Sequence, residues 1–463
     1  MFSGTNDHFN PSYFAQRRLI IKIFFYLALL LVPTLVLAQQ NYSLKDCITY
    51  GLKNNRSNIQ YANDLKIADA KGKEALADYL PSISLNGSLD DNLKVQESVI
   101  PAGIVGPNSI KVAFTERYNT NVTAEMDQTL YDQSLLTGLK ANKYNKQQAR
   151  LNQQQNDESI IYNVSNAYYQ IYVYREQLLL LKADLETYQK QLEISRLQVN
   201  KGTVLQTNMD KISVNYNNTR SQISVAESNL ALSENQLKTE MGYPLDIPLS
   251  VDSSSNETVN PISVVKDSLT VFQVSNRSDY QLSQVNSKLL EIDEKRIAAN
   301  ALPKLTAYAR YGGVGFGADL SPALSTLDPF STIGIKLNIP LFDFFRRNAQ
   351  HSQAKYKYLN ALEDTKLDEA EFRMEFENAR TKLNKATSNL ENDQRNIVLA
   401  QSVFKITDLQ YQKGVTGLTD WLNDRYSLKE AQNNYLVSLY NYYLARIDLE
   451  KANGTLKNFY NNL

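Results

Sequence analysis

The chain has 463 residues, and its 49 lysines and arginines equal its 49 aspartates and glutamates, so no net charge would hold nucleic acid or an anionic surface. Glycine (17) and proline (12) are scarce while tyrosine reaches 29, which favours long uninterrupted helices over a loop-rich catalytic fold. One cysteine, Cys47, and two histidines, His8 and His351, exclude internal disulfides and Cys/His metal clusters, so we expect no enzyme and no cofactor.

The N-terminal segment has the plan of a secretory signal peptide. Three basic residues, Arg17, Arg18 and Lys22, precede an apolar run over residues 23–37, and the small residue Ala38 follows it. The run is shorter than the roughly 18 to 20 apolar residues that a membrane-spanning helix needs. We therefore expect residues 1–38 to be a signal peptide, with a retained membrane anchor as the alternative.

The rest of the chain contains an internal duplication, in which short motifs recur in the same order. Leu80-Pro81 recurs as Leu302-Pro303, Leu130-Tyr131-Asp132 as Leu341-Phe342-Asp343, and Lys201-Gly202 as Lys413-Gly414. Each copy has the pattern of a helix, two strands, a very long helix, a glycine turn and a long returning helix. The predicted boundaries are a first repeat at 39–242, a linker or equatorial segment at 243–270, a second repeat at 271–456 and a C-terminal tail at 457–463.

Alternation of apolar and polar residues marks the strands. In the second copy the apolar positions are Ile333, Ile335, Leu337 and Ile339. Residues 83–89, 122–127 and 305–310 alternate in the same way, so we expect four strands in the chain. The apolar face would meet a second sheet in a soluble sandwich, or lipid in a membrane barrel whose polar face lines a lumen.

The predicted helices are unusually long. No glycine or proline occurs between Leu139 and Lys201 or between Leu341 and Lys413, and helices of that length would extend on the order of 90 to 110 Å. Apolar residues recur every seven positions along them, which predicts coiled-coil packing. Gly202 and Gly414 then mark the turns of two antiparallel hairpins, with tips near these residues. The fold class is mainly α with a small β part.

Four strands cannot cross a membrane alone, because the open edges would leave backbone groups without partners in hydrocarbon. Two chains would give eight strands, a barrel narrow enough for side chains to fill. Three would give twelve strands and leave room for a lumen. If the apolar face meets lipid, the pattern therefore predicts a homotrimer.

The duplication, the strand pairs and the glycine-tipped hairpins resemble the TolC-like outer membrane factor family. The best local matches are Tyr411-Gln412-Lys413-Gly414, Thr419-Asp420-Trp421-Leu422 and Ala452-Asn453-Gly454-Thr455-Leu456. The resemblance implies a passive trimeric channel, with a twelve-stranded barrel in outer-membrane lipid and a helical barrel in the periplasm. It also implies a periplasmic adaptor protein and an inner-membrane pump, in a tripartite efflux pump or a type I secretion system.

The resemblance further implies a periplasmic gate at the hairpin tips. In the family, a tyrosine and an arginine of the second hairpin bond polar residues of the first, and a ring of aspartates narrows the entrance. Tyr411 and Asp420 occupy the tyrosine position and the first aspartate position. Thr207 occupies the position of one of the polar partners on the first hairpin.

Three positions of that gate depart from the family pattern. Thr416 stands where the arginine is expected, Asn208 where an aspartate partner is expected, and Asn423 where the second aspartate of the ring is expected. We therefore expect neutral bonds such as Tyr411 to Asn208 to close the gate. Asp420 either attracts cations at the entrance or caps the returning helix.

A different class of function stays open on the residues alone. A periplasmic or surface coiled-coil structural protein without a pore would also show the long heptad helices. Such a protein would not need the strand pairs, so the strands separate the two readings.

Overall fold

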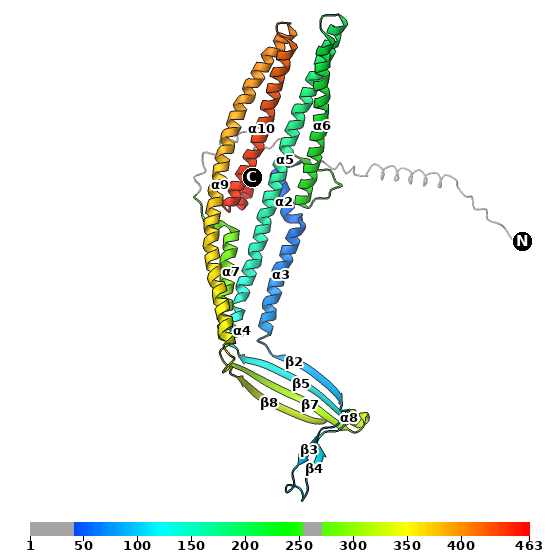
Figure 1. Ribbon diagram of the computed structural model, residues 1–463, viewed down its shortest axis with the longest axis vertical. Helices are drawn as coiled ribbons and strands as arrows, with labels where there is room; N and C mark the ends of the chain where they lie inside the picture. The colour runs from blue at the N-terminus through cyan, green and yellow to red at the C-terminus, as the bar shows by residue number, and fades with distance from the viewer. Residues whose placement is uncertain (1–40, 253–270) are drawn as a thin grey trace, which may run out of the picture.

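The computed structural model describes residues 41–252 and 271–463. The predicted signal peptide lies outside these ranges, as does most of the predicted linker. The molecule is long and narrow, with a four-stranded sheet at one end and the tips of two helical hairpins at the other (Figure 1).

The elements follow the predicted duplication. The first copy contains β1 (Asn41–Tyr42), α2 (Leu44–Asn54), α3 (Arg56–Ala77), β2 (Ser82–Asp91), β3 (Glu97–Ile100), β4 (Ile110–Ala113), β5 (Tyr118–Tyr131), α4 (Gln133–Leu139), α5 (Ala141–Asn200) and α6 (Gln206–Met241). The second part contains β6 (Ser250–Val251), a 3-10 turn (Val274–Asn276), α7 (Ser278–Ala299), β7 (Lys304–Gly317), α8 (Leu320–Ser325), β8 (Asp328–Asn338), α9 (Arg346–Gln412), α10 (Leu418–Ala452) and α11 (Leu456–Asn462).

The four predicted strands form one antiparallel sheet in the order β2-β5-β7-β8. The two copies meet at the central β5–β7 pair, so β2 and β8 are the open edges within the chain. Each strand is joined to a helix of the same copy, because α3 precedes β2, α4 follows β5, α7 precedes β7 and α9 follows β8. The wall of helices therefore continues the sheet strand by strand.

Register across the sheet separates an apolar from a polar face. One row of paired residues is Ile83, Met126, Ala309 and Ile333, and the next row is Ser84, Glu125, Arg310 and Thr332. On the polar face an Nη2 nitrogen of Arg310 lies 2.6 Å from Glu125 Oε1. Since side chains alternate along a strand, the pattern that was read from single strands is consistent across all four.

The sheet differs from the prediction at three places. Ile339 is not in a strand, because β8 ends at Asn338, which pairs with Lys304, the first residue of β7 after Pro303. Between the two predicted strands of the first copy, the chain also forms the β3–β4 hairpin. Between the two predicted strands of the second copy, it also forms the short helix α8, which packs on β7.

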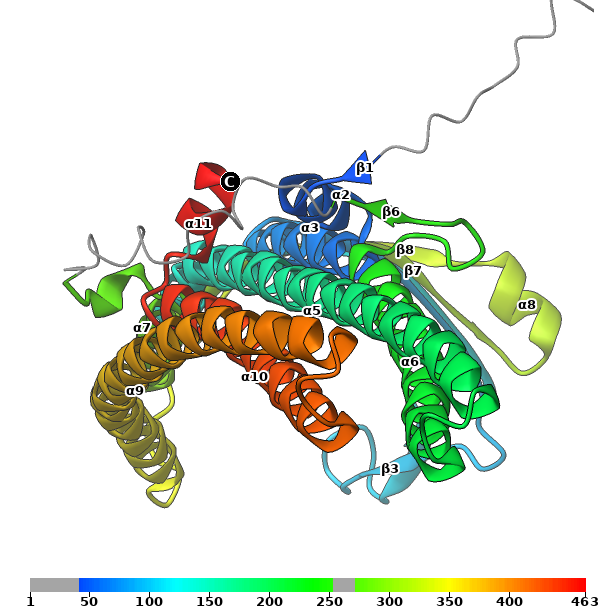
Figure 2. The same ribbon diagram turned by 90° about the horizontal axis from the view of Figure 1, so that it is seen from above.

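The long helices are as extended as predicted. Helix α5 has 60 residues and α9 has 67, which correspond to roughly 90 and 100 Å. Gly202 and Gly414 have φ angles of 71° and 72°, and they turn each long helix back toward its partner. Seen from above, α6, α5, α10 and α9 lie side by side in a curved row (Figure 2).

Heptad positions and small residues supply the packing between these helices. The main core lies near mid-length and includes Val164, Ile171, Phe376, Leu390 and Tyr442. The small residues of the returning helices are buried at Thr219, Ala226, Ser233, Ser438, Ala445 and Ala452. Their size allows the paired backbones to approach closely.

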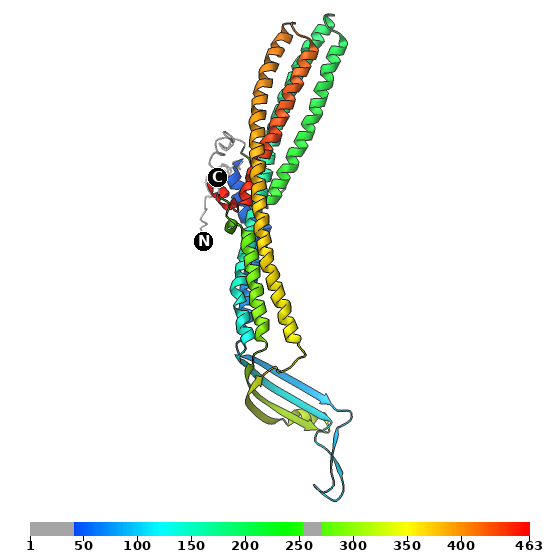
Figure 3. The ribbon, with the colours of Figure 1, turned by 60° about the vertical axis from the view of Figure 1, so that its left-hand side comes forward.

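A group of short elements projects from one side of this core (Figure 3). Strand β1 pairs with β6 in parallel, so the start of the predicted linker carries a strand. The segment 457–463, predicted as a tail, is mostly helix α11, because Phe459 is buried in the main core.

Candidate gate at the hairpin tips

A second, smaller core joins the two hairpins near their tips. Its buried residues are Tyr188 of α5, Ile212 of α6, and Leu418 and Trp421 of α10. Partly buried residues of all four helices pack around them, including Phe404 and Tyr411 of α9. The cluster thus contains side chains from both hairpins, so separating the hairpins would expose apolar surface to water.

Trp421 is the central residue of this cluster, and none of its surface is exposed. Its ring centroid lies 6.0 Å from that of Tyr188, 5.7 Å from Phe404 and 5.8 Å from Tyr411. The indole nitrogen donates a hydrogen bond of 2.8 Å to Asp408 Oδ1, so the buried polar atom is satisfied. Trp421 belongs to a predicted heptad stripe, but its position between two hairpins could not be read from periodicity.

A buried ion pair lies next to the cluster. The guanidinium of Arg425 on α10 bonds the carboxylate of Asp184 on α5, and both residues are more than nine-tenths buried. Arg425 also stacks over the ring of Phe404, with its guanidinium carbon 4.8 Å from the ring centroid. Burial raises the pKa of Asp184, and the charges of Arg425 and Lys429 oppose that rise.

This pair corrects the expectation that the hairpins are joined by neutral bonds alone. The residues that the family pattern places at the tip are indeed neutral here, but a charged link lies further along the same helices. Lys429 adds a third contact between hairpins, because its amine donates a 2.5 Å bond to Gln222 of α6. Asp184 and Arg425 are 241 positions apart, so no local sequence signal connects them.

The predicted gate residues do not all come together. Burial raises the pKa of Tyr411, and hydrogen bonds with Ser195 and Gln191 of α5 oppose this effect. The expected bond to Asn208 does not occur among the hydrogen bonds of the described residues. Tyr411 therefore lies beside α5 of the first hairpin, within the tip cluster.

Asp420 lies exposed in the first turn of α10, and its carboxylate accepts a 2.9 Å bond from the hydroxyl of Thr416. The N-cap residue of α10 is Gly417, without a side-chain cap bond, so Asp420 is not the cap residue itself. Thr207 and Asn423 are exposed. The threonine that stands in place of an arginine thus gives Asp420 a neutral partner.

Other chemistry is not indicated in the part of the chain that the structure describes. Residues 41–252 and 271–463 contain no group of three or more His, Cys, Asp or Glu side chains placed to hold a metal ion. None of the helices in these ranges combines the length and hydrophobicity needed to cross a bilayer. His351 bonds Glu294 at 2.8 Å on the surface between α7 and α9.

An elongated protomer with an amphipathic sheet at one end and two linked coiled-coil hairpins at the other has the architecture of a channel subunit. The chain belongs to the Outer membrane efflux protein family, whose model matches residues 51–243 and 282–455. The resemblance drawn from the sequence is thereby confirmed.

Individual relatives agree with this assignment. Outer membrane protein TolC of Escherichia coli (strain K12) is 21% identical over 348 residues, which cover 73% of this chain and 70% of TolC. The crystal structure of CusC has a TM-score of 0.70 at 18% identity, covering 88% of this chain and 91% of CusC. VceC from Vibrio cholerae has a TM-score of 0.69 at 16% identity, covering 89% of this chain and 96% of VceC.

The protein is therefore an outer-membrane exit channel for efflux and not an enzyme, with its helices extending into the periplasm. Proteins of this kind work with adaptor proteins and inner-membrane pumps. The reading as a coiled-coil structural protein without a pore is set aside by the family and by the four-stranded sheet.

Proposed function

We propose that three copies of the chain assemble into the exit duct of a tripartite efflux pump, with a twelve-stranded barrel in the membrane. The observation that supports this most directly is the sheet, which has two open edges and one face on which large apolar side chains are exposed. Ile333 is 88% exposed and Ile83 is 78% exposed on that face, which a soluble monomer would rarely present to water. Neighbouring copies would pair β8 with β2 and satisfy both edges.

The duct is passive in this proposal. The hairpin tips form its periplasmic gate, and an adaptor protein and an inner-membrane pump supply the energy for opening. Opening requires the two hairpins to move apart, which breaks the cluster around Trp421 and the pair between Arg425 and Asp184. Closure therefore combines apolar contact with one buried charged link.

The assembly is tested by the mass of the purified protein in mild detergent. We expect about three times the mass of one chain, because a single sheet of four strands leaves both edges open. Light scattering combined with size exclusion separates the protein mass from the detergent mass. A monomer that is stable, folded and monodisperse would contradict the proposal.

The orientation of the sheet is tested by a pair of arginine substitutions. Ile335→Arg should cost about 2 to 4 kcal/mol of folding free energy in lipid vesicles, because it places a charge on the lipid-facing side. Asn338→Arg, on the polar face, should cost much less. The measurement is urea unfolding of the reconstituted protein. Equal costs at the two positions would mean that the apolar face does not contact lipid.

The gate is tested by channel recordings in planar bilayers. Asp420→Ala should reduce cation preference and block by multivalent cations, because three carboxylates would converge at the entrance. Tyr411→Phe should raise conductance, because it removes the hydroxyl that lies beside the polar side chains of Ser195 and Gln191 on α5. Glu430→Ala, which removes an exposed carboxylate further along α10, is the control. Unchanged selectivity with lowered thermal stability would instead show that Asp420 only stabilises the helix start.

A further inference from the structure

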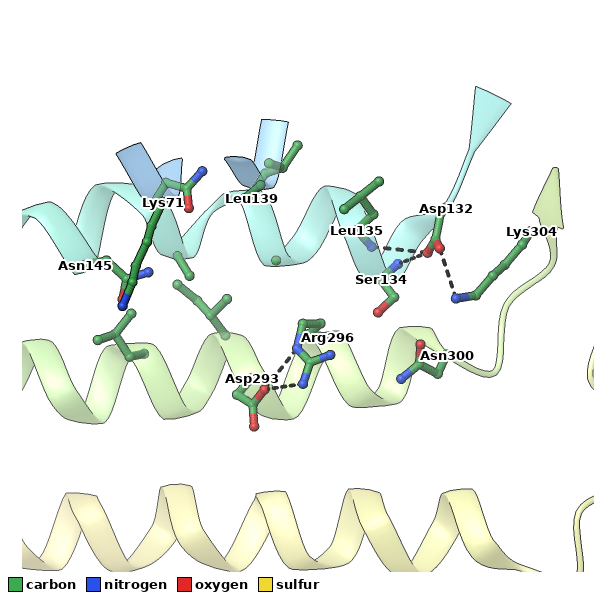
Figure 4. A pocket seen from close by; sticks show the side chains of 16 residues that line it. Lys71, Asp132, Ser134, Leu135, Leu139, Asn145, Asp293, Arg296, Asn300 and Lys304 are labelled. Atoms are coloured by element: carbon green, nitrogen blue, oxygen red, sulfur yellow. Dashed lines mark hydrogen bonds and ion pairs between the residues drawn. The ribbon is translucent and has the colours of Figure 1, made fainter. Parts of the chain in front are cut away.

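Two cavities lie where the helices meet the sheet, on opposite sides of the contact between α4–α5 and α7. They share Leu139 and Ile292, but their other lining residues alternate around the helices. The first cavity, of about 580 Å³, contains Asp132 and Lys304 and is shown in Figure 4. Lys304 pairs in register with Asn338 of the polar sheet face, so this cavity opens on the polar side.

Charges in the first cavity are largely matched. Lys304 Nζ lies 3.0 Å from Asp132 Oδ2, and an Nη2 nitrogen of Arg296 lies 2.7 Å from Asp293 Oδ1. Figure 4 shows both pairs as short contacts within the lining. This cavity therefore has no evident excess of one charge that would select a ligand.

The second cavity, of about 860 Å³, is strongly basic. Its lining includes Lys140, Lys143, Lys288 and Lys295, against one carboxylate, Glu291. Lys288 and Lys295 each lie 2.6 Å from that carboxylate. Lys140 and Lys143 have no ion pair among the described residues, so the cavity keeps an excess of positive charge.

The floor of the second cavity is apolar and ends close to the sheet. Leu139, Ile292 and Leu302 line it, and Leu302 lies two residues before β7 begins. The basic groups thus lie immediately beyond the ends of the strands, on the side away from the polar face. In the proposed duct this is the level at which the periplasmic leaflet ends.

An aromatic loop flanks this cavity. Residues 339–345 connect β8 to α9, and most of them line a neighbouring cavity that shares Ala298 with the basic one. Phe342, Phe344 and Phe345 are 67%, 85% and 73% exposed. Aromatic side chains concentrate at the two interfaces of membrane barrels, where one end of the side chain meets hydrocarbon and the other meets headgroups.

The loop holds these rings in an unfavourable backbone conformation. Phe344 and Phe345 have φ angles of 50° and 64°, and no other non-glycine residue of the described chain has a positive φ. Arg347 fixes the loop, because its side chain donates a 2.6 Å bond to Asp343 and a 3.0 Å bond to the carbonyl of Pro340. A strained loop that exposes two large apolar rings indicates that the rings have a contact outside the chain.

We propose that the basic cavity binds the phosphate of an anionic phospholipid from the periplasmic leaflet, with the acyl chains along the apolar sheet face beside the aromatic loop. The inference rests on the proposed placement of the sheet in the membrane. Four lysine ammonium groups supply the donors and the positive potential, and the apolar floor receives the glycerol end of the chains. The site thereby anchors the base of the helical wall to the membrane surface.

Titration of the detergent-solubilised trimer with phosphatidylglycerol, followed by native mass spectrometry, tests the site. Lys140→Gln together with Lys143→Gln should weaken binding by about tenfold, since each basic residue near a lipid surface contributes severalfold. The matched control is Lys382→Gln with Lys385→Gln, which removes two exposed lysines at the same spacing on α9. Equal binding by both double variants would overturn the proposal.

Further arms identify the source of the phosphate. Phosphatidylcholine should bind weakly, and inorganic phosphate at matched concentration should not displace phosphatidylglycerol. If inorganic phosphate competes fully, the cavity is a site for free anions and the lipid assignment fails. Retention of phosphatidylcholine to the same extent would also overturn it.

The aromatic loop has its own test. Phe344→Gly with Phe345→Gly removes both the rings and the strain, so phosphatidylglycerol binding should fall severalfold while the thermal unfolding midpoint in detergent stays equal or rises. Unchanged lipid binding would remove the loop from the site.

Channel recordings in planar bilayers with the same protein samples distinguish a failure of the lipid site from a failure of the proposed duct. If channels form but lipid binding does not depend on Lys140 and Lys143, only the lipid site fails. If lipid binding depends on these lysines but no channel forms, only the proposed duct fails.

Discussion

Replacing Arg425 by methionine should destabilise the protein by about 3 to 5 kcal/mol, because it leaves the buried carboxylate of Asp184 without its charged partner. Chemical unfolding of the hairpin region, followed by circular dichroism, measures the loss. Arg425→Met combined with Asp184→Leu should recover much of the stability, since two well-packed apolar residues avoid the buried charge. A double variant that is as unstable as the single one would show that packing over Phe404 is the main contribution of Arg425.

The loss should also depend on pH. Burial raises the pKa of Asp184, while Arg425 and Lys429 hold it down, so removing Arg425 raises this pKa further. A carboxyl group whose pKa is higher in the folded state stabilises the fold when protonated, and this contribution disappears as the pH rises through that pKa. The deficit of Arg425→Met should therefore shrink as the pH falls below the raised pKa of Asp184. A deficit that is constant with pH would mean that Asp184 does not ionise in the variant.

Replacing Trp421 by alanine should cost about 3 to 5 kcal/mol, because it empties the centre of the core that joins the hairpins. The same change should raise channel conductance, since contact with Tyr188 of the other hairpin is lost. Trp421→Phe keeps most of the apolar volume but removes the bond to Asp408, so its cost should be smaller. Thermal unfolding and bilayer recordings measure the two effects.

Tyr426→Ala is the control for this prediction, because Tyr426 lies on the same helix and is 67% exposed. Its cost should stay within about 0.5 kcal/mol, as for most exposed positions. Similar losses for the two variants would mean that the tip cluster does not hold the hairpins together.

The sequence carries enough information for the main elements of the fold because their signals are long and periodic. Alternation along residues 333–337 and heptads from Phe376 to Tyr411 each repeat often enough to fix the element type. Glycines at the hairpin tips mark turns that need a positive φ. Because the chain is duplicated, the elements predicted for one copy were also expected in the other. The sheet order places the two strand pairs side by side.

Features that depend on contacts between distant segments could not be predicted from these periodic patterns. Ile339 continues the alternation, but β7 begins too late to pair with it. The helix α11 is short, and it forms where Phe459 packs into the main core. The link between Asp184 and Arg425 joins two helices from different hairpins. The heptad period of each helix does not define how the two helices are rotated relative to each other.

The unbroken length of α9 also determines how far its tip can travel. Above Leu390, the last of its residues in the main core, about 22 residues or roughly 33 Å of helix lead to the turn. This arm contains no glycine or proline at which it could fold. A stiff arm of that length acts as a lever, so a tilt of about 10° at its base would carry the tip roughly 6 Å sideways. Small rearrangements of mid-length packing would thus be converted into a large change in aperture.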